Sequence, residues 1–573
     1  MPVHNRDIAQ TFDQLADLLE IADANPFRVR AYRNAARSLR ASGRNVADML
    51  AEGCDLSELP DIGEDLAAKI KEIVETGHLT LLEEVAQDVP RGLADVVALP
   101  GIGPKRARSL HEALGITSLD DLQRAAEDGR IAEVKGFGAK TQRRILDAVT
   151  RGKTRERRFR LDVAEDYAAP LLEYIRDLEG VEKAEIAGSY RRRKDTVGDL
   201  DIVAARSDGA KGIEGFIAYD EVARVVSRGE TRSTVILRSG LQVDLRIVAP
   251  ESFGAALHYF TGSKAHSIAC RRRANGKGLR MNEYGLFRGD KRQASNSETE
   301  IYDALGLPWI APVLREDRGE IEAADAGALP DLVRLEDIRG DLHMHTTASD
   351  GRNSLREMAQ AAQERGYEYI AITDHSRSQT VAGGLSIEDL EAQLDDIDAL
   401  NDTLEGLCVL KSSEVDILRD GTLDYPDDLL AKLDLVVASV HAGLDLDEDA
   451  QTERIIRAMD NPHVGIIGHP TGRLINARPA AAVDLERLIE AALERGCFLE
   501  INASPHRLDL DDVACRLARD AGLALSIGTD AHAVSGLDDM RFGIGQAQRG
   551  WLGPDDVLNT RGLNDLRDLL KRA

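Results

Sequence analysis

The chain has 573 residues, which at ~150 residues per domain corresponds to roughly four domains. Hydrophobic residues make up 43% of the chain and charged residues 30%, which is typical of folded globular domains and not of a disordered chain. The formal net charge of -27 argues against a protein coated in positive charge for non-specific binding to nucleic acid.

The sequence carries no feature of a membrane or secreted protein. No apolar run is as long as the ~18 residues of a membrane-spanning helix, and the N-terminal stretch lacks the apolar core of a signal peptide. The five cysteines form no Cys-x-x-Cys pair, which argues against a disulfide framework or a cysteine zinc site. We therefore expect a soluble, cytoplasmic protein that does not contact a membrane.

The charge is distributed unevenly along the chain. Residues 1–337 carry a net charge of -7, whereas residues 338–573 carry -20 and contain eight of the 13 histidines. The stretch Asp317–Asp337, rich in Glu, Asp, Ala and Gly, is typical of a linker. Two basic stripes, Arg151–Arg160 and Lys264–Arg292, lie in the first part. The average charge therefore does not describe the local surfaces.

A short pattern recurs three times near the N-terminus, at Leu59–Gly63, Leu99–Gly103 and Val134–Gly138. Each copy precedes a helical apolar pattern, and its glycines permit a tight turn whose backbone N–H groups suit a DNA phosphate, bound without reading bases. The copies resemble helix-hairpin-helix motifs, although the first has Asp61 where glycine is usual. An ordinary turn between two helices is the alternative. The predicted DNA-binding glycines and lysine are Gly101, Gly103, Lys105, Gly136 and Gly138.

Two aspartates lie on one predicted strand, Asp199–Ala204, and a third lies on a later strand. Residues two apart on a strand face the same side, so Asp199 and Asp201 converge, while Asp244 lies amid apolar neighbours. Three such carboxylates can hold two Mg²⁺ or Mn²⁺ ions that activate an attacking oxygen and stabilise a leaving pyrophosphate. An isolated Asp-x-Asp pair is more often a solvated strand edge. The residues expected to hold a triphosphate are Gly188, Ser189 and Arg192.

The segment Gly188–Arg192, its ten-residue spacing from Ser189 to Asp199, and Asp244 together resemble the nucleotidyltransferase palm of DNA polymerase family X. The resemblance extends over about residues 1–316, hairpins included. It implies a polymerase that adds nucleotides to a DNA 3′-OH and fills short gaps in base excision repair.

Further positions match this family's nucleotide and DNA contacts. Arg271 and residues 282–284 match thumb positions that follow the minor groove of template–primer DNA, whereas Ser267 stands where the family commonly has asparagine. An aromatic pair and a glycine match the motif that screens out a ribose 2′-OH, and the resemblance therefore implies contacts to the nucleotide sugar from Tyr259, Phe260 and Gly262.

The family also implies a second chemistry for the N-terminal helices. Lys69 falls at the position of a lysine that forms a Schiff base with 5′-deoxyribose phosphate, and Arg28 stands where a second, phosphate-binding lysine is common. A lysine can act in this way only if burial or neighbouring positive charge lowers its pKa. A solvated helix lysine is the alternative, so a possible lyase activity stays open beside phosphate binding.

In the acidic part, His343 and His345 are two apart at the end of a short predicted strand, so both face one site. Further histidines and carboxylates recur at the ends of apolar runs, which helical patterns such as Leu355–Arg365 and Asp484–Arg495 separate. Strand–loop–helix repeats predict a (βα) barrel with its chemistry at the strand C-terminal ends. Six imidazoles and three carboxylates suit two or three ions, and mixed nitrogen and oxygen ligands favour Mn²⁺, Zn²⁺ or Fe over Mg²⁺.

These motifs resemble the PHP (polymerase and histidinol phosphatase) domain over about residues 338–573. The resemblance implies a metal-dependent 3′→5′ exonuclease, with removal of 3′ blocking phosphates or hydrolysis at abasic sites as further reactions. All nine metal-ligand positions of that family are filled here, by His343, His345, Asp350, His375, Glu414, His441, His469, Asp530 and His532.

The expected fold is multidomain α/β, with helical helix-hairpin-helix domains, a mixed-sheet palm, a thumb and a distorted (βα) barrel of PHP type. We expect gapped or primer–template DNA and dNTPs as partners, and a monomer associated with the nucleoid. The alternatives are a PHP small-molecule phosphoesterase tethered to DNA-binding domains and a non-catalytic scaffold for DNA ends. The predicted boundaries, from lyase-like domain through fingers-like domain, palm, thumb and linker to PHP domain, are 1–88, 89–152, 153–250, 251–316, 317–337 and 338–573.

Overall fold

The computed structural model describes residues 5–41, 46–59, 61–97, 99, 102–138, 141–146, 158–207 and 211–571. The chain divides into two compact units, Met1–Arg157 and Arg158–Ala573, which are described separately. Gly101 and positions 151–157 of the first basic stripe lie outside the described residues. Within the described ranges, no helix is both long and apolar enough to cross a membrane.

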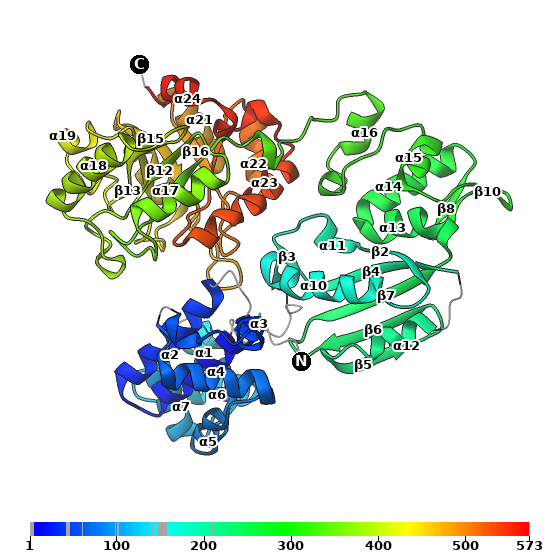
Figure 1. Ribbon diagram of the computed structural model, residues 1–573, viewed down its shortest axis with the longest axis horizontal. Coiled ribbons are helices and arrows are strands. Elements are labelled where there is room, and N and C mark those ends of the chain that lie inside the picture. The colour runs from blue at the N-terminus through cyan, green and yellow to red at the C-terminus, as the bar shows by residue number, and fades with distance from the viewer. Residues whose placement is uncertain are drawn as a thin grey trace. The chain divides into compact units, whose positions relative to one another are not determined.

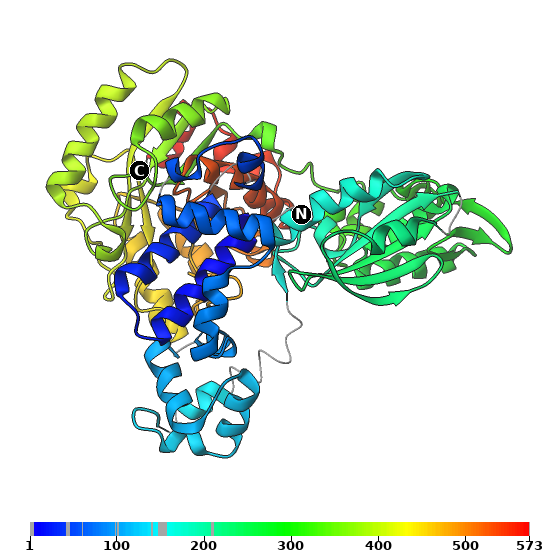
Figure 2. The same ribbon diagram turned by 60° about the horizontal axis from the view of Figure 1, so that its bottom comes forward.

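The first unit is helical, with α1 and α2 side by side (Figures 1 and 2). Apolar residues at helical spacing along α1, such as Ile8, Phe12 and Leu15, are buried. The Phe12 ring meets Tyr32 of α2 edge-on, with centroids 5.5 Å apart. Its helices include α1 (Asn5–Ile21), α2 (Pro26–Ala41), α3 (Val46–Ala51), η1 (Leu56–Glu58), α4 (Glu64–Thr76), α5 (Thr80–Asp88), α6 (Gly92–Val97), α7 (Pro104–Leu114), α8 (Leu119–Glu127) and η2 (Arg130–Glu133).

The second unit begins with a five-stranded mixed sheet in the order β2-β4-β7-β6-β5, in which only β4 and β7 run parallel. Its strands are β2 (Val181–Ile186), β4 (Asp199–Arg206), β5 (Val222–Arg228), β6 (Arg232–Leu237) and β7 (Gln242–Val248). A small ribbon and three helices complete the palm: β1 (Phe159–Arg160), β3 (Thr196–Val197), α10 (Leu161–Arg176), α11 (Gly188–Arg191) and α12 (Lys211–Ile217).

Alternation along β4 places the acidic pair. Leu200 and Ile202 join the apolar cluster with α10 and α12, whereas Val203 packs with α13 (Phe253–Thr261) in a separate cluster. Asp199 and Asp201 have the same parity as Val203 and therefore lie on the α13 side of the sheet.

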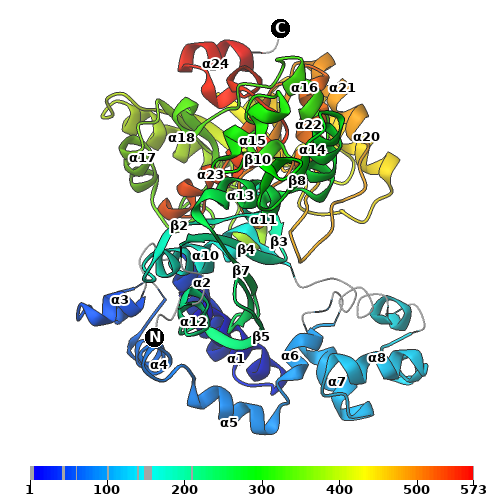
Figure 3. The ribbon, with the colours of Figure 1, turned by 90° about the vertical axis from the view of Figure 1, so that its right-hand side faces the viewer.

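The thumb follows, and Figure 3 shows α13, α14 and α15 close to β8. The segment predicted to be a linker contains α16 and η5, and Glu320 at the start of α16 is fully buried. The elements are η3 (Pro250–Ser252), α14 (Lys264–Gly276), β8 (Arg280–Asn282), β9 (Gly285–Arg288), β10 (Lys291–Ala294), α15 (Glu298–Leu305), η4 (Pro312–Leu314), α16 (Glu320–Asp325) and η5 (Leu335–Asp337).

Seven parallel strands, β11 to β17 in sequential order, form the C-terminal domain (Figure 1, light green to red). They are β11 (Gly340–Met344), β12 (Tyr369–Ile372), β13 (Cys408–Asp416), β14 (Leu435–Ser439), β15 (Val464–Gly468), β16 (Phe498–Asn502) and β17 (Leu525–Gly528). The surrounding helices are α17 (Leu355–Glu364), η6 (Thr380–Ala382), α18 (Ile387–Asn401), α19 (Asp427–Leu430), α20 (Glu448–Met459), α21 (Leu485–Arg495), α22 (Asp512–Asp520), η7 (Val534–Asp539), α23 (Met540–Arg549), η8 (Pro554–Asp556), η9 (Leu558–Thr560) and α24 (Leu563–Leu570).

The two ends of this sheet meet, so that the barrel nearly closes. The N–H of His345 donates to the carbonyl of Ala531 at 2.8 Å, and the N–H of Asp530 donates to the carbonyl of His343 at 2.8 Å. The predicted distorted (βα) barrel is therefore confirmed, as are the helical hairpin domains and the mixed sheet.

Candidate active sites

The three palm aspartates come together on neighbouring strands. In the parallel register of β4 and β7, Asp201 lies directly opposite Asp244, and Asp199 precedes it by two residues. Burial, followed by the charges of Asp199 and Asp244, raises the pKa of Asp201 to about 7. Three crowded carboxylates of this kind fit divalent cations with oxygen ligands, which offset the repulsion.

Two features hold this arrangement in place. Gly188 has a φ of +62°, and a Cβ placed there would lie 2.4 Å from Oδ2 of Asp201, so any other residue would be strained and would displace this carboxylate. Asp244 accepts hydrogen bonds from Thr234 Oγ1 at 2.6 Å and from Gln242 Nε2 at 2.8 Å. These two hydrogen bonds hold the Asp244 carboxylate in one orientation.

A cavity of about 570 Å³ opens beside the aspartates, and all the predicted nucleotide residues line it, together with Arg271. The rings of Tyr259 and Phe260 meet edge-on at 5.1 Å, and the Arg271 guanidinium lies 5.3 Å from the Tyr259 ring centre. The cations of the lining are Arg158, Arg192, Lys194, Lys264 and Arg271. Such a lining attracts an anion of high charge.

The nine predicted ligands of the barrel gather at the C-terminal ends of its strands. His343 lies in β11 and Glu414 in β13, whereas the other seven lie within or just beyond the strand ends or in the loop after β11. Glu414 is the centre: its Oε1 lies 2.9 Å from His469 Nε2 and 3.2 Å from His441 Nε2. Its Oε2 lies 2.8 Å from His375 Nδ1.

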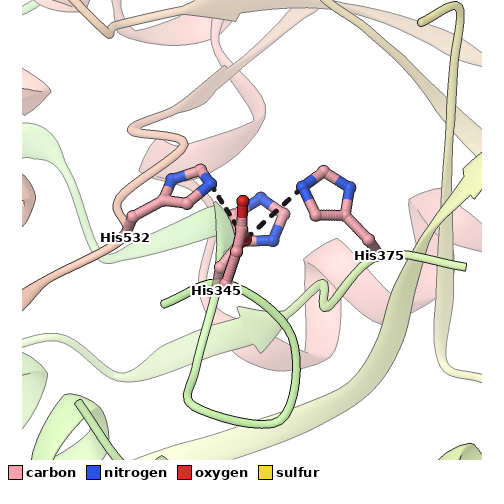
Figure 4. A group of neighbouring side chains, drawn as sticks. His345, His375 and His532 are labelled. Atoms are coloured by element: carbon pink, nitrogen blue, oxygen red, sulfur yellow. Dashed lines mark ion pairs between the residues drawn. The ribbon is translucent and has the colours of Figure 1, made fainter. Parts of the chain in front are cut away.

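A second group surrounds Asp350, whose Oδ1 lies 3.2 Å from His532 Nε2 and 3.6 Å from His375 Nε2. Figure 4 shows His345 between His532 and His375, and its ring stacks on both, with ring centres 4.2 and 4.4 Å apart. Asp530 Oδ1 forms a third centre, 3.2 Å from His345 Nε2 and 3.7 Å from His343 Nε2.

The donor set fits metal ions. Among the described residues, both carboxylate oxygens of Glu414, Nε2 of His343 and both ring nitrogens of His469 are buried, and none of their close contacts has the geometry of a hydrogen bond. Buried polar atoms are rarely left unpaired unless a water or an ion completes them. Three overlapping groups of ligand atoms, each within 4.8 Å, suit a cluster of two or three ions.

Sequence reasoning missed the residues that orient these ligands. Glu500, in the middle of β16, accepts from His343 Nδ1 at 2.6 Å, and Asp416 accepts from His441 Nδ1 at 2.6 Å. A Cβ at Gly528 would lie 2.2 Å from Oε1 of Glu500, so this glycine is required for the close approach. β16 is the one barrel strand for which the sequence predicted no ligand, and this gap in the pattern could have indicated Glu500.

The helical hairpins place their glycines at open turns. Gly103 caps α7, with Lys105 in the first turn of that helix. A Cβ at Gly103, Gly136 or Gly138 would meet no atom within 4 Å, which leaves room for a partner. Asp61 has a φ of +60°, so the first hairpin adopts the left-handed turn without a glycine.

Lys69 and Arg28 line one cavity of about 400 Å³ in the first unit. Lys69 Nζ lies 2.5 Å from Asp65 Oδ1, and Glu72 and Glu84 line the same cavity. The structure thus brings the two predicted basic residues together, but in acidic surroundings.

Four family models match the chain. Residues 3–79 match a helix-hairpin-helix domain, residues 93–150 a SAM-like helix-hairpin-helix tandem, residues 256–316 the DNA polymerase beta thumb and residues 341–504 the PHP domain. The matches cover both units.

The chain is 39% identical to the DNA polymerase/3′-5′ exonuclease PolX of Bacillus subtilis (strain 168), over 574 residues that cover 100% of both proteins. A probable phosphatase of Thermoanaerobacter sp. (strain X514) is 31% identical over 242 residues, 40% of this chain and 94% of that protein. DNA polymerase lambda of Rattus norvegicus is 25% identical over 343 residues, 55% of this chain and 56% of that protein. The chain therefore belongs to the bacterial-type family X DNA polymerases with a C-terminal PHP domain.

Proposed function

We propose that the protein fills short gaps in damaged DNA as a DNA-directed polymerase and trims DNA 3′ ends with its PHP domain. The observation that supports this is the presence, in one chain, of three adjacent aspartates beside a cationic cavity and of nine candidate metal ligands gathered at one end of the barrel. A scaffold would need neither, and a tethered phosphoesterase would not need the first.

In the polymerase reaction, Arg192 and the backbone at Gly188 and Ser189 bind the triphosphate of a dNTP. Tyr259 and Phe260, whose rings pack edge-on at the cavity, are the residues that would contact the sugar and exclude a 2′-OH. The ions that Asp199, Asp201 and Asp244 would hold are Mg²⁺ or Mn²⁺, which when bound activate the primer 3′-OH and offset the charge of pyrophosphate.

In the PHP reaction, the imidazoles and carboxylates would hold two or three ions of Mn²⁺, Zn²⁺ or Fe, which when bound activate water and stabilise the transition state of phosphodiester hydrolysis. Glu500 and Asp416 hold His343 and His441 in the ring orientation that presents Nε2 to the cluster. The hairpin turns, Gly103 and Gly136 among them, bind the backbone of gapped DNA without sequence preference. Because each site is complete within one chain, we expect a monomer.

We further propose that Lys69 and Arg28 bind the 5′-phosphate side of a gap, with Lys69 as the candidate lyase nucleophile. Its amine must first leave the ion pair with Asp65. Borohydride trapping on 5′-deoxyribose-phosphate DNA tests this, and unchanged trapping in Lys69→Ala would exclude Lys69.

Primer extension and degradation on gapped DNA, with Mg²⁺ or Mn²⁺, test the two main activities. Asp201→Ala should abolish extension and retain degradation, whereas His343→Ala should do the opposite. His463→Ala is the matched control, because His463 lies in the barrel outside the cluster. Loss of both activities in either variant would contradict two independent sites.

The PHP half also resembles a probable phosphatase over nearly the whole of that protein. Hydrolysis of a small phosphate monoester is therefore a second candidate activity of the same cluster. Comparing the hydrolysis rates of p-nitrophenyl phosphate and of a DNA 3′ end decides which substrate class is preferred.

A further inference from the structure

Besides Asp199 and Asp201, one further carboxylate lines the nucleotide cavity among its cations. Glu316 lies just beyond η4 and lines the cavity with Arg192 and Lys194. A triphosphate entering the cavity is attracted by the cations and repelled by this carboxylate.

Glu316 Oε1 is shared between the palm and the barrel. On the palm side, Arg192 Nε lies at 3.0 Å and Lys194 Nζ at 3.9 Å. On the barrel side, NH1 of Arg549, at the end of α23, lies at 3.1 Å. The side chain of Arg549 is only 2% exposed, so this contact is shielded from water.

Both terminal nitrogens of the Arg549 guanidinium make polar contacts. Its NH1 also donates to the carbonyl of Arg192 at 2.7 Å, and its NH2 lies 2.5 Å from Asp512 Oδ2. Burial raises the pKa of Glu316, but the charges of Arg192, Arg549 and Lys194 outweigh it and hold this pKa below its ordinary value. The carboxylate is therefore a charged competitor at the position where a triphosphate needs Arg192.

We propose that Glu316 competes with the nucleotide triphosphate for Arg192, and that Arg549 of the barrel weakens this competition by holding Glu316. Docking of the barrel then raises the affinity of the palm for nucleotide. By thermodynamic reciprocity, bound nucleotide strengthens the contact between Arg549 and the palm. The inference rests on the proposed polymerase function, because it takes Arg192 as a triphosphate ligand.

The experiment measures the Kd of the complementary dNTP for the full-length protein on gapped DNA with a dideoxy-terminated primer and Mg²⁺. Glu316→Gln should lower this Kd about fivefold, the effect of losing one partly buried ion pair. Arg549→Met should raise it about fivefold in the wild-type background and leave it unchanged in the Glu316→Gln background.

A matched control breaks another contact between the same helix and the palm. Arg541 NH2 lies 3.0 Å from Glu165 Oε2, and neither residue lines the cavity. Arg541→Gln should therefore leave the Kd unchanged. In Arg549→Met, Asp512 keeps its ion pair with Arg318 at 2.9 Å, which limits the damage to the fold. If Arg549→Met does not fold, Arg549→Lys should also raise the Kd, because lysine keeps the positive charge but lacks the planar guanidinium that contacts two partners at once.

Two results would overturn the inference that Glu316 competes with the triphosphate. One is an unchanged or higher Kd in Glu316→Gln, and the other is an equal effect of Arg549→Met in both backgrounds. If the wild-type protein extends an unmodified primer, the proposed polymerase function stands, and either of these two results refutes only the role given to Glu316. If wild-type protein neither extends a primer nor binds dNTP, the proposed polymerase function fails and the inference fails with it.

Discussion

Replacing Gly188 by alanine should disable the polymerase while leaving the nuclease intact. The added Cβ would lie 2.4 Å from Oδ2 of Asp201, whereas ordinary contact begins at 3.4 Å. Asp201 must therefore move by about 1 Å, and a displacement of this size at a reacting centre costs about 100-fold in rate. The φ of +62° adds strain of about 1–2 kcal/mol to the folded state.

Single-turnover filling of a one-nucleotide gap measures the rate, and degradation of the same DNA serves as the internal reference. Gly496→Ala is the matched control, since Gly496 has a φ of +65° but no atom within 4 Å of an added Cβ. It should show similar strain and normal activities. Extension at the wild-type rate in Gly188→Ala, or equal loss of both activities, would refute the role given to the approach of Gly188 to Asp201.

Three further outcomes follow from the other contacts. Glu500→Gln should lower the affinity of the barrel for Mn²⁺, as measured by metal titration, about 10- to 100-fold. Primer extension should stay unchanged, and an unaltered Mn²⁺ affinity would contradict the orienting role of Glu500. Glu298→Gln leaves the fully buried Arg315 without its partner at 2.5 Å, so thermal unfolding should show a loss of about 3–5 kcal/mol. Arg191 and Arg315 outweigh burial and hold the pKa of Glu298 below the usual glutamate value of 4.5. This stabilisation is therefore present above pH 4.5 and lost as the pH falls, and a glutamine should remove that dependence. Gly103→Val should weaken binding to DNA of every sequence about equally, and a sequence-dependent change would contradict backbone contact.

The grouping of the candidate ligands at both sites was predictable because it follows local spacing rules. Alternation on a strand places Asp199 and Asp201 on one face, and the ends of parallel strands place His375 and His441 at one end of the barrel. These rules need only the period of each element and the order of the strands. They therefore hold without knowledge of side-chain packing.

The contacts that tune the sites were not predictable in this way. Glu500 is far from His343 in the sequence, and although its strand was the one without a predicted ligand, no residue beside it identifies it as the partner of His343 Nδ1. Glu316 and Arg549 meet across two domains, and each reads in sequence as an ordinary surface charge. Such pairs depend on how folded elements pack, which residue spacing does not encode.

The interface between palm and barrel combines apolar packing, in which Leu508 and Phe542 of the barrel join the palm cluster, with arginines that reach carboxylates and carbonyls. Arg473 pairs with Asp195 at 3.4 Å, Arg541 with Glu165 at 3.0 Å and Arg549 with Glu316 at 3.1 Å. Polar contacts of this kind can exchange partners at small cost, whereas a large apolar interface resists change. In a protein whose two active sites act in opposite directions on a DNA 3′ end, an interface that responds to an anionic substrate can favour synthesis while nucleotide is bound. The net charge of -27 does not indicate these contacts, because the charges that form them are few and lie at the interface between two domains.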